Sequence, residues 1–534
     1  MTSDPRAFLA ADHGGATSGA ALIGRVGHAW RLLGSVALPA AVGDAAAAAL
    51  VVERFAAAAP ALAARLGIDP AHVDAIPAVR VRSSTPRTLG VVAASERALE
   101  PLTAAAARSG WRVVSASAAT TDPLAMTALL LDPAVDGVLA GAGDPPGADE
   151  RGAIAELTSL VAAVAARQPD RLVILAGGMA DSVGAFGDAS ARDGETLLAP
   201  AAREGAAGAP LRELLTELAA PADDARRAIG AATASLAELL DRRIEVIEIG
   251  FDGGLRARSS PGGPGEPPST DVAMVPAARL VPADPDDAAV DRVLGWVTTA
   301  SDRHRLRDRM RELRIAPWSD ATGDGMAFRL AALRAALGRL AEATPECSAG
   351  PPPDLVIAAG GAWSTMPPAS VALAINDVIR RPGATAFAID HARLLGALGS
   401  IPDADERRAV LADMVDDLLA PIGTVVTPAG LRTGRSAGSL VLHAASAGPA
   451  LDLHPGGLQV VALPAGTSAV AEFRFRDGVR LGVRGRHFAI EVAGGLAGLM
   501  VDLRDVPLRL PDRSDRRREL LDGWQAAVTG PVAR

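Results

Sequence analysis

Short apolar strands that end in small-residue turns and alternate with helices constrain the fold of this chain more than any other feature. Examples are "TLGVVAAS" (88–95), "VDGVLAGAGD" (135–144), "RLVILAGGMA" (171–180) and "PPPDLVIAAGG" (351–361). Buried strands that alternate with helices are typical of a parallel α/β sheet. The turns then lie at the carboxyl ends of the strands, where open α/β sheets bind their ligands. The sequence therefore predicts an α/β protein with ligand-binding turns.

The length and the changes in texture along the chain predict several domains. A chain of 534 residues is too long for one ordinary core. Strands joined by tight turns are expected at 7–40 and an amphipathic helix at 44–67, whereas 259–290 is rich in Pro and Gly and predicts a loop or linker. Beyond about residue 421, short β segments precede a closing amphipathic helix. We expect a first lobe with inserted α/β units at 1–240, a second lobe at 241–420 and a β-rich region with a terminal helix at 421–534.

Composition excludes several classes of protein. A net charge of −9 argues against a general nucleic-acid binder. The chain has no lysine, so no lysine can bind phosphate or form a Schiff base. The sequence contains no uncharged apolar run of about 18 residues, so it predicts no membrane helix. The first residues lack the pattern of a signal peptide. Cys347 is the one cysteine, and we assign it no functional role. These features predict a cytoplasmic protein.

Two acidic residues stand at strand ends that precede small-residue turns. Asp12 ends the apolar run in "FLAADHGGATSG" (8–19), and Glu248 ends the one in "IEVIEIGFDGG" (244–254). Many proteins hold a metal-bound phosphate at an acidic strand end that is followed by such a turn. The second stretch repeats the arrangement of the first and indicates an internal repeat. The structural alternative is that both acids only end strands and face solvent.

Several segments together resemble one family, the MutL (GlmL) proteins associated with adenosylcobalamin-dependent glutamate mutase. These proteins belong to the actin–sugar kinase–Hsp70 ATPase superfamily. The resemblance covers about residues 8–526. It is carried by the turn at 12–19, "SSTPRTL" (83–89), the turns at 141–147, 248–254 and 359–362, and "VAGGLAGLMVDLRDVPLRLP" (492–511). The last stretch is the most specific and has a structural rather than a catalytic character.

The resemblance implies a two-lobed, duplicated ribonuclease H-like fold of the actin/sugar kinase/Hsp70 kind, with α/β insertions. It implies that ATP and Mg²⁺ are bound and that Asp12 and Glu248 are catalytic and hold the metal, largely through water. The nucleotide would contact Gly14, Gly15, Thr17, Ser18, Asp144, Gly250, Gly360 and Gly361. The implied partner is a subunit of a B12-dependent mutase.

The phosphate turns depart from the family pattern. Gly19 stands where the family has a cation, Gly15 and Ala16 replace hydroxyl residues, and Phe251 fills a glycine position. Each lost charge-assisted hydrogen bond is worth about 1.5–3 kcal/mol, so phosphate binding is expected to be weakened. An arginine could replace the missing cation in space, and the candidates are Arg256 and Arg87.

Three functions follow in order of preference. The first is a nucleotide-dependent chaperone or reactivating factor for a B12-dependent mutase. The second is a pseudo-ATPase scaffold that binds a partner without hydrolysing ATP, because the phosphate turns are degenerate. The third is a small-molecule kinase or ATP-dependent hydrolase on the same fold. If the protein is an enzyme, we expect at most a weak ATPase. The sequence does not decide this question or the oligomeric state.

Overall fold

The computed structural model describes residues 6–83, 85–186, 196–203, 205–219, 224–263, 268–282, 284–317, 319, 323–345, 347, 351–363, 365–432, 436–444 and 448–530. The chain forms two compact units. The first comprises Met1–Ser83, Asp223–Val272 and Ala278–Arg534, and the second comprises Ser84–Ala222 and Ala273–Ala277. Both units mix helices with sheets, as the alternating sequence pattern predicts. The three consecutive domains expected from the sequence divide the chain differently, and that division stays a prediction.

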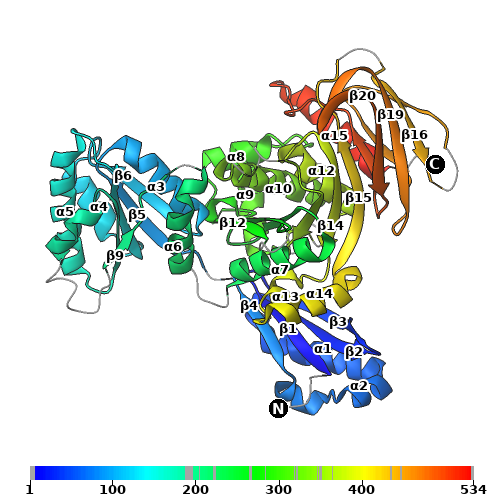
Figure 1. The fold of residues 1–534 in the computed structure, drawn as a ribbon, viewed down its shortest axis with the longest axis horizontal. Helices are drawn as coiled ribbons and strands as arrows, with labels where there is room; N and C mark the ends of the chain where they lie inside the picture. Colours follow the sequence, from blue (N-terminus) through cyan, green and yellow to red (C-terminus); the bar gives the residue numbers. More distant parts are fainter. Residues whose placement is uncertain are drawn as a thin grey trace. The chain divides into compact units, whose positions relative to one another are not determined.

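The first unit begins with a four-stranded sheet in the order β3-β2-β1-β4. β1 is antiparallel to β2 and parallel to β4. One face of this sheet is apolar and packs against α1 (Figure 1). The expected helix at 44–67 is divided in two, because Ala59 leaves the helical conformation just before Pro60. The elements are β1 (Ala7–His13), β2 (Thr17–Val26), β3 (Ala29–Pro39), α1 (Asp44–Ala58), α2 (Pro60–Leu66) and β4 (Ala78–Arg82).

The outer strand of this sheet, β3, is held by a helix from much later in the chain, α14 (Ala404–Leu418). The backbone N–H of Trp30 donates to Asp413 at 2.9 Å, and that of Leu32 donates to Asp417 at 3.2 Å. An edge strand presents unpaired N–H groups that can recruit other chains. The two carboxylates satisfy these groups and tie the first sheet to α14.

The first unit continues with an eight-stranded sheet in the order β12-β11-β10-β13-β14-β15-β21-β18. β10 is antiparallel to β11 and parallel to β13, so it repeats the pairing pattern of β1. Its strands are β10 (Ile244–Ile249), β11 (Gly254–Ser260), β12 (Ser269–Val275), β13 (Leu355–Ala359), β14 (Gly383–Asp390), β15 (Leu419–Thr427), β18 (Leu458–Val461) and β21 (Gly498–Asp502). The other helices of this unit are α7 (Ala225–Leu240), α8 (Asp287–Leu294), α9 (Arg303–Ile315), α10 (Gly323–Ala343), α12 (Pro368–Val378), α13 (Leu395–Gly399) and α15 (Ser514–Thr529).

The β-rich texture expected beyond residue 421 corresponds to a further sheet of the first unit, in the order β17-β16-β19-β20. Phe473 and Phe475 stack at 5.8 Å between ring centroids in its core. The strands are β16 (Gly438–His443), β17 (Leu451–Leu453), β19 (Ser468–Leu481) and β20 (Val483–Ala493). The predicted closing helix is α15.

The second unit is a parallel sheet in the order β6-β5-β7-β8-β9 with helices packed against it (Figure 1). The strand order turns back on itself between β5 and β7, and the carboxyl end of such a reversal is where doubly wound sheets bind ligands. The elements are β5 (Thr88–Ala93), α3 (Glu96–Arg108), β6 (Arg112–Ser117), α4 (Pro123–Leu131), β7 (Gly137–Ala142), α5 (Glu150–Arg167), β8 (Leu172–Gly177), β9 (Thr196–Ala199) and α6 (Ala209–Ala219). The strand–helix alternation expected from the sequence is confirmed here.

Across the described residues, no single helix has both the length and the apolar character needed to cross a membrane. One pair of helices, Asp44–Ala58 and Pro60–Ala75, meets these criteria only when the two are taken together. The pair is bent by 119° at the break between them.

Candidate functional site

The turns after β1 and β10 have the same backbone geometry. The N–H of Gly14 donates to the carbonyl of Thr17 at 2.9 Å, and the N–H of Gly250 donates to the carbonyl of Gly253 at 2.8 Å. A Cβ on Gly14 would lie 3.3 Å from the Thr17 carbonyl oxygen, and a Cβ on Gly250 would lie 3.3 Å from the Gly253 carbonyl oxygen. Both turns are therefore closed equally tightly. The sequence echo between these two stretches is therefore a structural repeat at the level of the hairpin.

The two acids that precede these turns lie close enough to influence each other. Burial, together with the nearby Asp390 carboxylate, raises the pKa of Asp12 to about 6, although the charge of Arg393 opposes this rise. Burial and the charges of Asp12 and Asp390 raise the pKa of Glu248 to about 8. Crowded carboxyl groups that favour their neutral forms are typical of functional sites. Both residues are half-buried rather than fully exposed, and their roles toward a ligand stay predictions.

Asp390 is a third acid at the end of a strand, β14. Its side chain is buried, and its carboxylate accepts hydrogen bonds from the N–H groups of Leu394 and Leu395, both at 3.0 Å. Burial raises the pKa of Asp390, and these hydrogen bonds oppose the rise. The same loop carries Arg393, so a carboxyl group and a guanidinium reach the site from one short segment.

The Gly360–Gly361 turn closes the site from the end of β13. Gly360 has a φ of 92°, and a Cβ there would lie 2.7 Å from Cγ of Glu248. A Cβ on Gly361 would lie 3.3 Å from Nη1 of Arg393. Glycine is required at the first position by its backbone and by the close side chain. This turn, predicted to contact the nucleotide, thus lies directly against the acidic and basic groups of the site.

The turn after β1 packs against the turn after β10. A Cβ on Gly15 would collide with the carboxylate of Asp252 and lie 3.0 Å from the ring of Phe251. Arg314 of α9 stacks over that ring at 3.4 Å, and its Nη1 donates to the Phe251 carbonyl at 2.6 Å. The other arginines of 301–314 mostly pair with nearby acids on the surface, whereas Arg314 lies 3.7 Å from Asp252 of the turn after β10.

Two predicted contact residues have other partners. Ser18 is fully buried, and its hydroxyl lies 2.7 Å from Nδ1 of His13 within the same hairpin. Asp144 belongs to the second unit and pairs with Arg203 at 3.6 Å across an exposed surface. Their roles toward a nucleotide stay predictions.

Of the two arginines suggested as replacement cations, Arg256 does not fill that place, and the role of Arg87 stays a prediction. Arg256 is fully buried and paired with Glu245 and with the hydroxyl of Thr344. Arg87 lies in the second unit, where it stacks over Trp111 at 5.1 Å. The arginine that does lie beside the predicted phosphate turn is Arg393. Its Nη1 donates to Thr17 Oγ1 at 2.7 Å.

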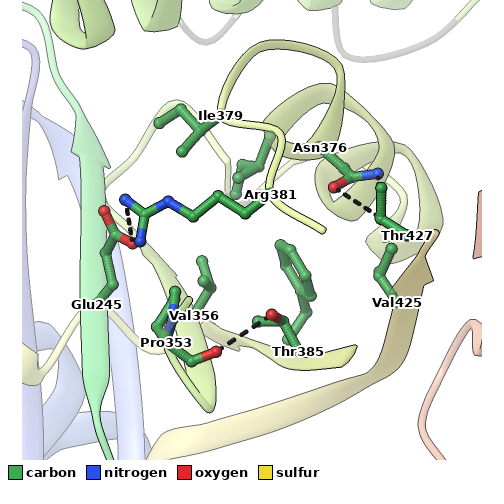
Figure 2. Close-up of a pocket in the computed structure, with 11 residues that line it drawn as sticks. Glu245, Pro353, Val356, Asn376, Ile379, Arg381, Thr385, Val425 and Thr427 are labelled. Carbon is green, nitrogen blue, oxygen red and sulfur yellow. Dashed lines mark hydrogen bonds and ion pairs between the residues drawn. The ribbon is translucent and has the colours of Figure 1, made fainter. Parts of the chain in front are cut away.

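A small cavity in the first unit lies beside β10, toward the strand end opposite Glu248. Figure 2 shows Arg381 extending along it toward Glu245, with Nη2 3.8 Å from Oε2, while Thr385 bonds the carbonyl of Pro353 at its edge. Its volume is about 20 Å³, which suits a single water molecule. This cavity is too small for a nucleotide and belongs to the packing of the sheet.

The acids fit a hard divalent cation held largely through water. Within the described residues, no three His, Cys, Asp or Glu side chains are grouped so that they could hold a metal ion on their own. Mg²⁺ usually keeps several waters and takes only one or two carboxylates, its other ligands coming from substrate phosphates. Asp12 and Glu248 could supply such a pair, and the charge of a cation would favour the ionised forms that burial and the neighbouring carboxylates disfavour.

The comparisons with known proteins give little. No family model matches the sequence, and no curated protein matches it. Component A of the Acidaminococcus fermentans (R)-2-hydroxyglutaryl-CoA dehydratase is similar at 9% identity over 75% of this chain and 98% of that chain, with a TM-score of 0.27. The ATP-dependent caprolactamase of Pseudomonas jessenii is similar at 12% identity over 83% and 81%, with a TM-score of 0.28. An Aquifex aeolicus member of the Ppx/GppA family gives 7% identity over 76% and 86%, with a TM-score of 0.21. Scores this low decide neither fold nor function.

Sequence reasoning missed Asp390, Arg393 and Arg314. A signal was present for the first two, because "FAIDHAR" (387–393) is a third apolar strand that ends in an acid. No comparable signal marks Arg314, which lies in a helix crowded with exposed arginines.

The turn predicted at 141–147 is organised by Glu150 of α5 at the strand-order reversal of the second unit. Its carboxylate accepts from Ser95 Oγ at 2.6 Å and from the N–H groups of Gly147 at 2.8 Å and Gly143 at 3.3 Å. Burial raises the pKa of Glu150, but these hydrogen bonds outweigh it, so the pKa lies below its ordinary value. The carboxylate thus stabilises the fold above the ordinary glutamate pKa, and this stabilisation is lost as the pH falls through the lowered value.

Glu150→Gln is expected to destabilise the second unit by about 3 kcal/mol at neutral pH. The substitution replaces one carboxylate oxygen by an NH₂ group, which cannot accept the hydrogen bonds that the backbone N–H groups donate. The matched control is Glu156→Gln, an exposed position on the same helix. Denaturant unfolding of both variants measures the difference. Equal stability of the two would show that the Glu150 hydrogen bonds contribute nothing net.

Proposed function

We propose that this protein binds a magnesium-bound adenine nucleotide between the turns after β1 and β10, on a two-lobed fold of the actin/sugar kinase/Hsp70 kind. The observation that carries the proposal is the meeting of Asp12 and Glu248, each at the end of an equivalent hairpin strand, with pKa values raised to about 6 and about 8. The resemblance of the turns to those of the MutL family supports the same place.

In this proposal Asp12 and Glu248 hold Mg²⁺, mainly through its waters. The metal supplies positive charge that offsets the charge of the nucleotide phosphates. The N–H groups of the two turns other than those of Gly14 and Gly250, together with the Thr17 hydroxyl, are the donors proposed for the phosphate oxygens. Gly360 and Gly361 are the positions of the β13 turn that would contact the nucleotide, and their lack of side chains leaves room beside them for Glu248 and Arg393.

The biological role we propose is a nucleotide-dependent reactivating factor, or chaperone, for an adenosylcobalamin-dependent mutase of the glutamate mutase type. The family resemblance supports this role. Closure of two lobes around a nucleotide is a common way to drive remodelling of a partner. The direct assay adds this protein and Mg·ATP to an inactivated mutase and follows the recovery of mutase activity. No recovery with a cognate mutase would contradict the role.

Asp12→Asn is expected to weaken the binding of Mg·ADP at least tenfold, because it removes one of the two charged groups that hold the metal. Isothermal titration measures the dissociation constant. The control is Asp74→Asn, an exposed acid of the same region that lies outside the site. An unchanged dissociation constant in Asp12→Asn, with binding by the wild type, would remove the role assigned to Asp12.

A pseudo-ATPase scaffold is the second candidate, and one contact favours it. The turn after β1 packs at Gly15 directly against Asp252 and Phe251, and these side chains crowd the approach to the predicted phosphate turn. A phosphate-release assay separates the two candidates. Nucleotide binding with no release above a heat-treated control would favour the scaffold, whereas slow release that Asp12→Asn abolishes would favour the ATPase.

A further inference from the structure

Arg393 lies where three segments of the first unit meet. Its guanidinium donates to Thr17 Oγ1 on β2 at 2.7 Å. A Cβ on Gly19 would lie 3.2 Å from Nη2, and a Cβ on Gly361 would lie 3.3 Å from Nη1. Two glycines from segments far apart in the sequence therefore leave room for one guanidinium. A Cβ at either position would require the guanidinium to shift by a few tenths of an ångström.

The guanidinium has hydrogen-bonding capacity to spare. An arginine carries five N–H donors, and within the described residues the bond to Thr17 is the one its side chain makes. No described carboxylate lies within 4.0 Å of it, although Asp12 is near enough for the charge of Arg393 to lower its pKa. A half-buried arginine held at a glycine-lined seam, with most of its donors unused, is arranged to receive an oxyanion.

The backbone at Arg393 points the same way. Its φ is 56°, in the left-handed region that non-glycine residues adopt at a cost. Such conformations persist where the surrounding structure holds them in place, and they cluster at ligand-binding sites. Asn or Gly would be the easier residue at this position, and arginine stands there instead.

We propose that Arg393 is the phosphate-binding cation of this site, delivered from the loop after β14 rather than from the turn after β1. The inference rests on the proposed nucleotide function and names the residue that binds the phosphate. The ligand chemistry is a polyphosphate, because a planar guanidinium binds phosphate oxygens in pairs. Gly19 and Thr17 then have defined roles, the first as space for the guanidinium and the second as its anchor.

The test uses sodium tripolyphosphate without metal ions, in the presence of a chelator, and isothermal titration of the full chain. Arg393→Asn removes the charge and keeps a residue that tolerates the left-handed backbone. Arg393→Lys keeps the charge but loses the planar fork. Arg54→Gln is the control, since it removes an exposed arginine of α1 in the same unit. Circular dichroism and melting curves verify that each variant is folded.

We expect tripolyphosphate to bind at least tenfold more weakly to Arg393→Asn, at an intermediate level to Arg393→Lys and unchanged to Arg54→Gln. Wild-type binding that Arg393→Asn leaves unaltered would overturn the inference, as would no binding by the wild type at millimolar tripolyphosphate. If Arg393 served only to neutralise Asp12, Arg393→Asn would bind Mn²⁺ more tightly and tripolyphosphate equally, which also overturns it. The proposed function is tested separately by Mg·ADP and Asp12→Asn, so the two can fail independently.

Discussion

Raising the pH from about 6 to about 9 is expected to lower the melting temperature of the metal-free protein, and Glu248→Gln is expected to remove most of that loss. Burial and the charges of Asp12 and Asp390 raise the pKa of Glu248 to about 8. Between the ordinary pKa of glutamate and this value, the folded protein holds a proton that the unfolded chain has released. Stability therefore falls as the pH rises through this window, and the full penalty applies above it.

The expected loss for Glu248 is on the order of 3 kcal/mol, because each pKa unit corresponds to about 1.4 kcal/mol and the site is partly accessible to water. A glutamine cannot ionise, so the variant keeps the stability that the wild type has at low pH. The variant should melt higher than the wild type at pH of about 9 and equally at pH of about 5.

The response of the melting temperature to Mg²⁺ or Mn²⁺ distinguishes a cation-binding site from a group of crowded carboxylates that binds no cation. We expect millimolar divalent cation to restore the melting temperature of the wild type at high pH and to leave Glu248→Gln unchanged, because two charged oxygens are needed to hold the ion. Glu53→Gln, an exposed position on α1, is the control for a change of one charge. A melting temperature of the wild type that does not respond to pH between these values would refute the raised pKa of Glu248.

Asp502→Asn is expected to destabilise the first unit by about 3–5 kcal/mol, because it leaves buried arginines without their charged partner. Asp502 is fully buried at the end of β21. Its carboxylate accepts from Asn376 Nδ2 at 2.7 Å, from Arg380 Nη2 at 2.8 Å and from Arg504 Nε at 2.8 Å. Burial raises the pKa of Asp502, but Arg504 and Arg380 lower it well below the ordinary range. This ionised carboxylate supports stability at neutral pH and loses that effect only in strong acid.

The network extends beyond Asp502, so its loss is not confined to one pair. Arg504 Nη1 pairs with Asp377 at 2.7 Å, and Asp377 also pairs with Arg334 at 2.7 Å. Asp505→Asn is the matched control, since Asp505 is exposed three residues further on. Denaturant unfolding followed by tryptophan fluorescence is the measurement, because Trp524 stacks over Arg504 at 4.5 Å. Equal midpoints for the two variants would show that the network contributes no net stability.

This network includes two residues of the stretch at 492–511, which is the most specific part of the family resemblance. Asp502 and Arg504 lie inside it, and their partners come from α12 and the residues that follow it. The stretch was expected to be structural, and its side chains do fill the core of the first unit. Asn376, the chain's one asparagine, is used there as well.

The amino-acid sequence by itself determined the local elements and the two acidic strand ends. Apolar runs followed by glycine fixed the strands of the second unit and the hairpins that end near Asp12 and Glu248, because burial and turn geometry are set by neighbouring residues. The tertiary structure alone decided which cation stands beside them. Arg393 reaches Thr17 and Gly19 from a loop more than 370 residues later in the chain, whereas Arg256, closer to Glu248 in the chain, is enclosed with Glu245. Strand pairing sets these distances, and no local pattern records which long side chain a fold will bring to a glycine-lined gap.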